Sequence, residues 1–180
     1  EGDQPDLKKL AELSANYQVE LIIDEAHATG LFGRNGAGLC NDAGIENKCF
    51  ARVYTFGKAI GSHGAVIVGS QKLKDYLINF SKPFIYSTAL DMHNLLNVKH
   101  SYFYLQKTIN QRNKLNNLIL YFKNKFEPVK VDFKLIGEGP IFGMLIPGNE
   151  NCRKMAAHLQ NNGFDVRPIV SPTVPKGTER

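Results

Sequence analysis

The most reactive-looking side chain of this sequence is a lysine among small residues. Lys58 lies in the run Thr55-Phe56-Gly57-Lys58-Ala59-Ile60-Gly61-Ser62. Lysines usually lie on polar faces, where the stem covers the surface and the amine meets water. Here apolar stretches at 52–56 and 64–68 flank it on both sides, and we expect such surroundings to disfavour the charged amine. A neutral amine is what a lysine needs to form an imine.

A second group of candidates follows an apolar run upstream, in Asp24-Glu25-Ala26-His27. Asp24 alone suits a carboxylate that caps a turn, but it could also bind a pyridinium nitrogen and keep it protonated, which makes the ring an electron sink. His27 alone suits a structural histidine, but with Asp24 it could bind the phenolic oxygen of the same ring. Ala26 is small enough to lie flat under that ring. Together with Lys58, the set predicts pyridoxal 5′-phosphate (PLP) chemistry.

The residues around Lys58 admit the same two kinds of interpretation. Thr55 is either a β-branched strand residue or a hydroxyl donor to a phosphate. The glycines of this segment would let the backbone approach a ligand closely. Lys58 itself could instead neutralise a buried acid. Each signal is weak alone, and only the combination indicates a cofactor site.

Two other kinds of site, a zinc site and a nucleotide-hydrolysis site, could use some of the same residues. His27 with Cys40 and Cys49 could suggest zinc, but the spacing matches no common zinc pattern, and we predict no metal site. Asp-Glu-Ala-His after an apolar strand is also the Walker B box of one helicase class, whose carboxylates hold Mg²⁺ and position water. That class needs a G-x-x-x-x-G-K-[ST] loop, which Gly57-Lys58 does not provide.

Composition narrows the classes further. The chain has 180 residues, 43% of them hydrophobic, and a net charge of +5 spread along its length, which argues against nucleic-acid binding. Three cysteines form no CxxC pair, which favours free thiols in a reducing compartment such as the cytoplasm. No apolar run approaches membrane-spanning length. Because the chain begins with Glu rather than Met, we expect a piece of a longer protein.

The first 100 residues predict an α/β fold with a mainly parallel sheet and covering helices. Ligands of such sheets gather at the carboxyl ends of strands, and Asp24 and Lys58 each lie just past one. The elements expected from periodicity are a helix at 6–17, a buried strand at 19–23, a loop at 30–44, strands at 52–56 and 65–68, and a helix at 72–80.

The rest of the chain predicts a connecting helix and a small α+β domain. Residues 92–126 contain neither Gly nor Pro and form one long helix or two abutting ones. We expect a large domain at 1–100, the connection at 101–126 and an incomplete small domain at 127–180. The small domain is expected to hold strands at 133–136, 141–146 and 164–170 and a helix at 151–162, with Gly163 just past its end.

Four segments of the chain resemble the α-oxoamine synthases, a family of fold-type I PLP enzymes. They are Asp24-Glu25-Ala26-His27-Ala28-Thr29-Gly30, Thr55-Phe56-Gly57-Lys58-Ala59, Phe84-Ile85-Tyr86-Ser87-Thr88-Ala89, and Ser171-Pro172-Thr173-Val174-Pro175 with Gly177-Thr178. The resemblance covers all 180 residues in the same order and with similar spacing. It implies decarboxylative condensation of a small amino acid with an acyl-CoA or acyl-carrier-protein thioester.

The resemblance also implies a role for each matching residue. Lys58 would bind the cofactor and then act as acid and base at the substrate's α-carbon. Asp24 would pair with the ring nitrogen, His27 with the phenolic oxygen, and Thr55 with the phosphate. Ser87 and Thr88 would reach the phosphate held by a neighbouring subunit, which implies a homodimer with shared sites. Thr173 would lie near the substrate.

The resemblance leaves several points open. The family's Gly-rich phosphate segment and ring-stacking histidine are expected before Glu1, and its carboxylate-binding arginine just beyond Arg180. The wording of the motifs favours L-alanine and a pimeloyl thioester as substrates, but sister enzymes that use glycine or serine share the same Asp, His and Lys. A cofactor-free dimerising module is the alternative from another class.

Overall fold

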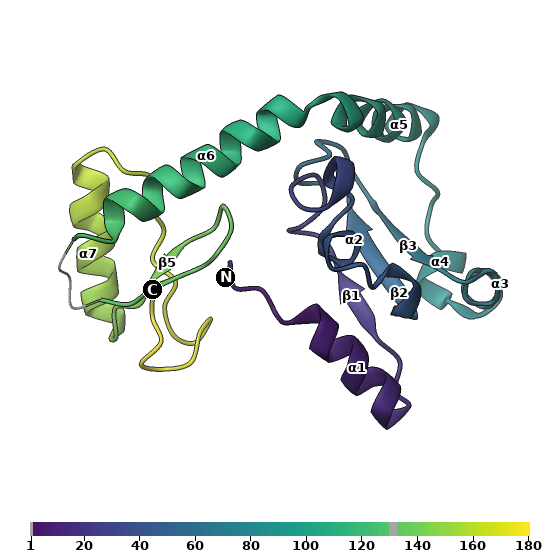
Figure 1. Ribbon diagram of the computed structural model, residues 1–180, viewed down its shortest axis with the longest axis horizontal. Helices are drawn as coiled ribbons and strands as arrows, with labels where there is room; N and C mark the ends of the chain where they lie inside the picture. The colour runs from purple at the N-terminus through teal and green to yellow at the C-terminus, as the bar shows by residue number, and fades with distance from the viewer. Residues whose placement is uncertain (1, 130–132) are drawn as a thin grey trace. The chain divides into compact units, whose positions relative to one another are not determined.

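The computed structural model describes residues 2–129 and 133–180 (Figure 1). It divides into two compact units. One is Pro5–Asn113, and the other is Lys114–Arg180 with a few N-terminal residues. The division falls inside the stretch assigned to a connecting helix, but the domain limits at 100 and 126 stay predictions.

A three-stranded sheet forms the centre of the first unit. Its strands are β1 (Ile22–Asp24), β2 (Ala51–Thr55) and β3 (Ala65–Gly69), and β2 lies between the other two (Figure 1). The register of the parallel pair β1–β2 places Asp24 opposite Val53. The carboxyl ends of these two strands therefore meet at one edge of the sheet, and both candidate motifs begin there.

The α/β class is confirmed, the three-stranded sheet is mixed, and one expectation about it is wrong. β3 runs antiparallel to β2, because the loop that joins them is too short for the crossover that a parallel pair needs. The strand predicted as buried at 19–23 is the short β1, whose Ile22 is 60% exposed. Among the described residues β1 pairs with β2 alone, so little covers that strand.

Helices α1 (Leu7–Tyr17) and α2 (Leu39–Ala43) build the core of this unit. Asp6 caps α1 by accepting a 3.0 Å hydrogen bond from the Lys9 amide, so the helix predicted at 6–17 is confirmed. α2 lies within residues 30–44, which the sequence predicted to be a loop, so that prediction is wrong for this part. The buried core that these helices form comprises Leu7, Ala11, Cys40 and Ile45.

Two of the remaining helices follow capping signals in the sequence. Ser70 caps α3 (Gln71–Phe80) and Asp91 caps α5 (Met92–Lys107) through hydrogen bonds from backbone amides. Of the two options for 92–126, two abutting helices are found. The break is at Thr108, whose hydroxyl donates to the Leu105 carbonyl at 3.1 Å. The other helical elements are η1 (Arg34–Gly36), η2 (Glu46–Lys48), α4 (Lys82–Ile85) and α6 (Ile109–Phe126).

The second unit holds a two-stranded antiparallel ladder and a helix. β4 (Leu135–Ile136) and β5 (Gly143–Met144) are shorter than predicted, and α7 (Asn149–Asn161) confirms the expected helix. Gly163 follows it with φ of +88°, as a residue past a helix end often does. The strand predicted at 164–170 is wrong: its regular pairing is limited to the mutual backbone hydrogen bonds of Ile169 with Arg180.

Candidate active site

In the turn after β1, some side chains are exposed to solvent and others are buried. Asp24 accepts a 2.8 Å hydrogen bond from the Ala26 amide, and the amides of Ala28 and Thr29 both donate to the Glu25 carbonyl. Asp24 and His27 are exposed, whereas Glu25, Ala26 and Ala28 are buried. The turn therefore presents a carboxylate and an imidazole and keeps the small residue between them below the surface.

Glu25 has a structural role that the sequence did not reveal. Its side chain is 1% exposed, and its two oxygens accept hydrogen bonds from the amides of Leu39 at 2.8 Å and Cys40 at 2.7 Å. It thereby binds the start of α2, which follows Gly38 and has no capping side chain of its own. A Cβ on Gly38 would lie 2.6 Å from Oε2 of this carboxylate. The sequence signal for this role is that α2 begins directly after a glycine, which has no side chain to cap it.

This use of Glu25 bears on the helicase alternative. In a Walker B box the second carboxylate is needed for the attacking water. Here both oxygens of Glu25 are taken by backbone amides inside the protein. The structure therefore argues against a Walker B role for Glu25.

Lys58 lies in the tight loop that joins β2 to β3. The Phe56 amide donates to the Gly64 carbonyl at 2.9 Å, and the Ser62 amide donates to the Phe56 carbonyl at 2.8 Å. Phe56 and Ile60 are buried and anchor the loop. The Lys58 side chain is exposed, so the expected enclosure between apolar strands is wrong for this chain. The reason is that β2 and β3 form a hairpin, which puts Lys58 at its tip.

The Lys58 loop contacts the turn after β1 directly. Gly30 has φ of +84°, and a Cβ there would lie 2.7 Å from the Cβ of Ala59. Only a residue without a side chain allows the two backbones to come this close. The edge of the Phe56 ring also meets Tyr102 of α5, with 6.4 Å between the ring centres. The two motifs, 29 positions apart in the sequence at Gly30 and Ala59, are thus packed neighbours.

Polar contacts brace the strand that carries Thr55. Arg52 donates to Glu46 at 2.7 Å and to the Tyr54 hydroxyl at 3.0 Å. Hydrogen bonds from Asn41 and then from Arg52 hold the pKa of Glu46 below its usual value. Burial raises the pKa of Tyr54 to about 12. These groups stay in fixed charge states near neutral pH, which suits a scaffold rather than a reacting group.

Thr55 provides a test of whether the site fits a phosphorylated cofactor. Its hydroxyl is buried and has no hydrogen-bond partner among the described residues. Buried hydroxyls without partners are uncommon in folded proteins, and each calls for an explanation. A phosphate oxygen is an acceptor that this hydroxyl could bind, so the residues present fit the group that the sequence predicted.

The other predicted hydroxyls are not brought to Lys58 by a described contact. Ser87 and Thr88 are exposed in the segment after α4, where the Ser87 hydroxyl donates to the Pro83 carbonyl. Thr173 is exposed and belongs to the second unit, where its amide donates to the Val170 carbonyl at 3.0 Å. The roles of these three residues stay predictions.

The zinc alternative finds no support in the placement of the cysteines. Cys40 is fully buried and its sulfur lies 3.8 Å from that of Cys49. Burial raises the pKa of the Cys40 thiol. In the part of the chain that the structure describes, no group of three His, Cys, Asp or Glu side chains could hold a metal ion.

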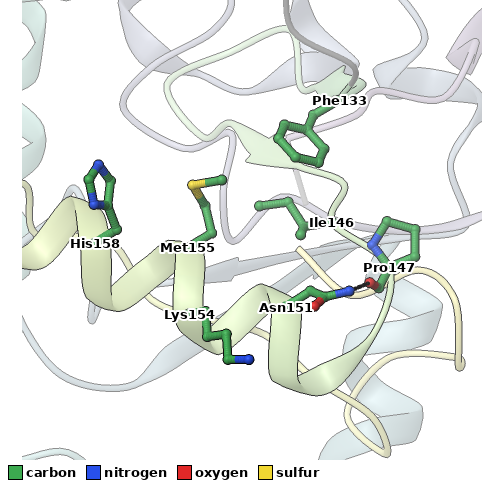
Figure 2. A pocket seen from close by; sticks show the side chains of 7 residues that line it. All are labelled: Phe133, Ile146, Pro147, Asn151, Lys154, Met155 and His158. Atoms are coloured by element: carbon green, nitrogen blue, oxygen red, sulfur yellow. Dashed lines mark hydrogen bonds between the residues drawn. The ribbon is translucent and has the colours of Figure 1, made fainter.

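The second unit holds an open pocket that the sequence did not predict. It has a volume of about 520 Å³, and Figure 2 shows that four of its side chains come from α7. Asn151 is tied to the wall by a 3.3 Å hydrogen bond to the Pro147 carbonyl. The pocket is lined by Phe133, Ile146, Pro147, Asn151, Lys154, Met155 and His158. No predicted site residue lines it.

Comparison with known proteins decides the family. The profile of the family described as aminotransferase class I and II matches residues 2–180. The chain belongs to this family. The 8-amino-7-oxononanoate synthase of Emericella nidulans is 38% identical over 167 residues, which are 88% of this chain and 40% of that protein. The enzyme of that name from Vibrio atlanticus is 36% identical over all of this chain and 44% of its own length.

Two solved structures agree with the fold. The 8-amino-7-oxononanoate synthase of Francisella tularensis has a TM-score of 0.83 at 29% identity, over 96% of this chain and 51% of that one. The serine palmitoyltransferase of Sphingomonas wittichii has a TM-score of 0.87 at 22% identity, over 99% and 45%. The latter shows the fold alone. The resemblance to α-oxoamine synthases predicted from the sequence is confirmed.

Two further findings concern the length of this chain and its helices. It spans less than half the length of the curated relatives named here. None of the helices in the described ranges is both long enough and apolar enough to cross a membrane.

Proposed function

We propose that this chain is the lysine-bearing part of a PLP-dependent acyltransferase that condenses L-alanine with a pimeloyl thioester to give 8-amino-7-oxononanoate, a step of biotin synthesis. The observation that carries the proposal is the contact between the Lys58 loop and the Asp24–His27 turn, with the unpartnered Thr55 hydroxyl beside them. The names of the relatives supply the particular substrates.

The residues of this chain would divide the work as follows. When bound, PLP supplies an electron sink for a carbanion at the substrate's α-carbon. Asp24 keeps the ring nitrogen protonated, His27 binds the phenolic oxygen, and Thr55 holds the phosphate. Lys58 would hold the cofactor through its amine and would move protons at the substrate's α-carbon. Lys58 is exposed on a loop anchored by buried Phe56 and Ile60, so its amine is accessible to a cofactor.

The assembly and the remaining contacts are part of the proposal. Ser87 and Thr88 would reach the phosphate bound by a second copy, which makes the protein a homodimer, and both are exposed as this requires. Thr173 would contact the substrate. The free cysteines support a reducing compartment, and we propose the cytoplasm.

Chemical labelling tests the central role. The full-length protein with PLP should be yellow, and borohydride reduction followed by peptide mapping should place a pyridoxyl group on Lys58. Lys72 and Lys74 are matched controls, because both are exposed lysines on α3. A pyridoxyl group on either of them instead would overturn the assignment. A colourless protein would favour the cofactor-free module.

Substrate trials separate the sister activities. L-Alanine, glycine and L-serine should each be offered with pimeloyl, acetyl, succinyl and palmitoyl thioesters. We expect turnover with alanine and the pimeloyl thioester. Preference for glycine or serine would move the protein to the 2-amino-3-oxobutyrate ligase, 5-aminolevulinate synthase or serine palmitoyltransferase type.

A further inference from the structure

A second buried hydroxyl without a partner follows Lys58 in the chain, at Ser62, whereas Thr55 precedes Lys58. The Ser62 hydroxyl, like that of Thr55, is buried and has no hydrogen-bond partner among the described residues. Other hydroxyls of the chain are satisfied by nearby backbone: that of Ser14 donates to the Val19 carbonyl at 2.6 Å, and that of Thr29 to the Glu25 carbonyl at 2.7 Å. The two unsatisfied hydroxyls thus both belong to the Lys58 loop.

The loop holds Ser62 in place and keeps its side chain from a local partner. Serine usually satisfies its hydroxyl by bonding a carbonyl three or four residues back. Here the Ser62 amide is tied to the Phe56 carbonyl at 2.8 Å, and the Phe56 amide is tied to the Gly64 carbonyl at 2.9 Å. Thr55 is the residue before Phe56, so one short stretch of hydrogen-bonded backbone carries both hydroxyls.

We infer that Ser62 is a cofactor-binding residue whose hydroxyl, together with that of Thr55, donates a hydrogen bond to the phosphate of the cofactor that Lys58 binds. This inference rests on the proposed function. Two hydroxyl donors without acceptors, carried by one hydrogen-bonded stretch of backbone, suit an anionic group with several oxygens, because hydrogen bonds to ionised acceptors are the strong ones. The phosphate is the part of PLP that carries such oxygens.

The test compares two ligands that differ only in the phosphate. In the full-length protein, Ser62→Ala should weaken PLP binding about tenfold or more, because a hydrogen bond to a charged group is lost. Binding of pyridoxal, which lacks the phosphate, should change by no more than about twofold. Ser62→Thr keeps a hydroxyl and should restore most of the affinity for PLP. Affinities are measured by absorbance titration of the cofactor-free protein.

Thermal unfolding without cofactor separates cofactor binding from a structural role. Ser62→Ala removes a hydroxyl that has no partner, so the melting temperature of the cofactor-free protein should stay the same or rise. Ser14→Ala is the matched control: it removes a bonded hydroxyl, so it should lower the melting temperature and leave PLP affinity unchanged. If Ser62→Ala lowers the melting temperature as Ser14→Ala does, Ser62 is structural and the inference is wrong.

The remaining outcomes are distinguishable. Equal losses for PLP and pyridoxal, or no loss for either, would overturn the phosphate contact while normal labelling of Lys58 leaves the proposed function standing. Failure of the unsubstituted protein to label Lys58 would remove the proposed function and this inference with it. Should Ser62→Ala not fold, the serine is structural and the inference falls.

Discussion

Asp24 and Glu25 are adjacent carboxylates with opposite surroundings. Asp24 is exposed at the end of β1, and Glu25 is 1% exposed with both oxygens bound by amides at the start of α2. One is free to meet a ligand, whereas the other holds an element in place. Substitutions at these two positions should therefore affect different measurements.

We predict that Glu25→Ala lowers the free energy of unfolding of the full-length protein by at least about 2 kcal/mol, because the amides of Leu39 and Cys40 lose their acceptors. Asp24→Asn should change stability by no more than about 0.5 kcal/mol, since the side chain is exposed. It should instead slow turnover about a hundredfold, roughly 3 kcal/mol, because the ring nitrogen of bound PLP loses its proton. Urea unfolding and turnover assays measure the two effects.

Each variant serves as the control for the other. Turnover of Asp24→Asn within a few-fold of the unsubstituted protein would show that the pairing with the ring nitrogen is wrong. A Glu25→Ala protein of unchanged stability would contradict the capping role.

At this scale the sequence predicts candidate residues for the chemistry but not the residues that hold them in place. Asp24, His27 and Lys58 are recognisable because their types and order suit one cofactor. The role of Glu25 was not predictable, since its partners are the amides of α2, a helix that the glycine-rich composition of 30–44 concealed. The unpartnered hydroxyls of Thr55 and Ser62 depend on three-dimensional packing, which a sequence pattern does not report.

At the scale of elements, the close contact between the two motif loops depends on Gly30. We predict that Gly30→Ala destabilises the protein by more than Gly44→Ala does. Both glycines have positive φ, +84° and +69°, so both variants bear the cost of about 1 kcal/mol for a side chain in that conformation. Only Gly30→Ala adds a clash, because its Cβ would lie 2.7 Å from that of Ala59, whereas nothing lies within 4 Å at Gly44.

The comparison of the two glycine variants has two readouts. Thermal unfolding gives the difference in stability, and PLP affinity reports whether the Lys58 loop has moved. Equal losses of stability and affinity in the two variants would contradict the close approach of the loops.

A buried glutamate also binds the start of α7, and its protonation should change the stability of the protein as the pH falls. Glu179 is 1% exposed and accepts hydrogen bonds from the amides of Gly148 and Gly177, each at 2.9 Å. The Gly148 hydrogen bond, above all, holds the pKa of Glu179 below its ordinary value of 4.5. The folded state therefore favours the ionised form. This contribution is fully present above pH 4.5 and is lost as the pH falls through the lower folded-state pKa.

We predict that the stability difference between the unsubstituted protein and Glu179→Gln is constant near neutral pH and shrinks below pH 4.5. Thermal unfolding from about pH 3 to about pH 7 measures it. Glu150→Gln is the matched control, since Glu150 pairs with Lys154 on an exposed face where an ion pair contributes little. A difference that does not depend on pH would contradict the ionised role of Glu179.

Helices were predicted better than strands, for a physical reason. A helix is specified locally, as the capping residues Asp6, Ser70 and Asp91 show. A strand exists only if a partner lies beside it. Residues 164–170 have the composition of a strand, but of the backbone hydrogen bonds described for them only the mutual pair of Ile169 with Arg180 has the form of strand pairing, so no strand forms.

At the scale of the whole molecule, much apolar surface stays uncovered within the described residues. Ile22 of β1 is 60% exposed, and Ile67 of β3 is 51% exposed. Both strands are edges of the three-stranded sheet, with one partner each among the described residues. Exposed apolar edges promote pairing with other chains. The chain also covers less than half the length of its relatives, which are expected to use residues outside these 180 for the substrate carboxylate and the cofactor ring.

We therefore predict that the 180-residue chain on its own self-associates and shows no condensation of L-alanine with a pimeloyl thioester. A protein of the relatives' length that contains this chain should sediment as a dimer and turn over. Sedimentation velocity and a carbon dioxide release assay on the two proteins measure the contrast. Lys58 of the short chain could still bind PLP, but weakly, because the phosphate would have few partners besides Thr55 and Ser62. Turnover by the 180-residue chain alone would show that it holds every residue the reaction needs, and the site would then have to be reassigned within it.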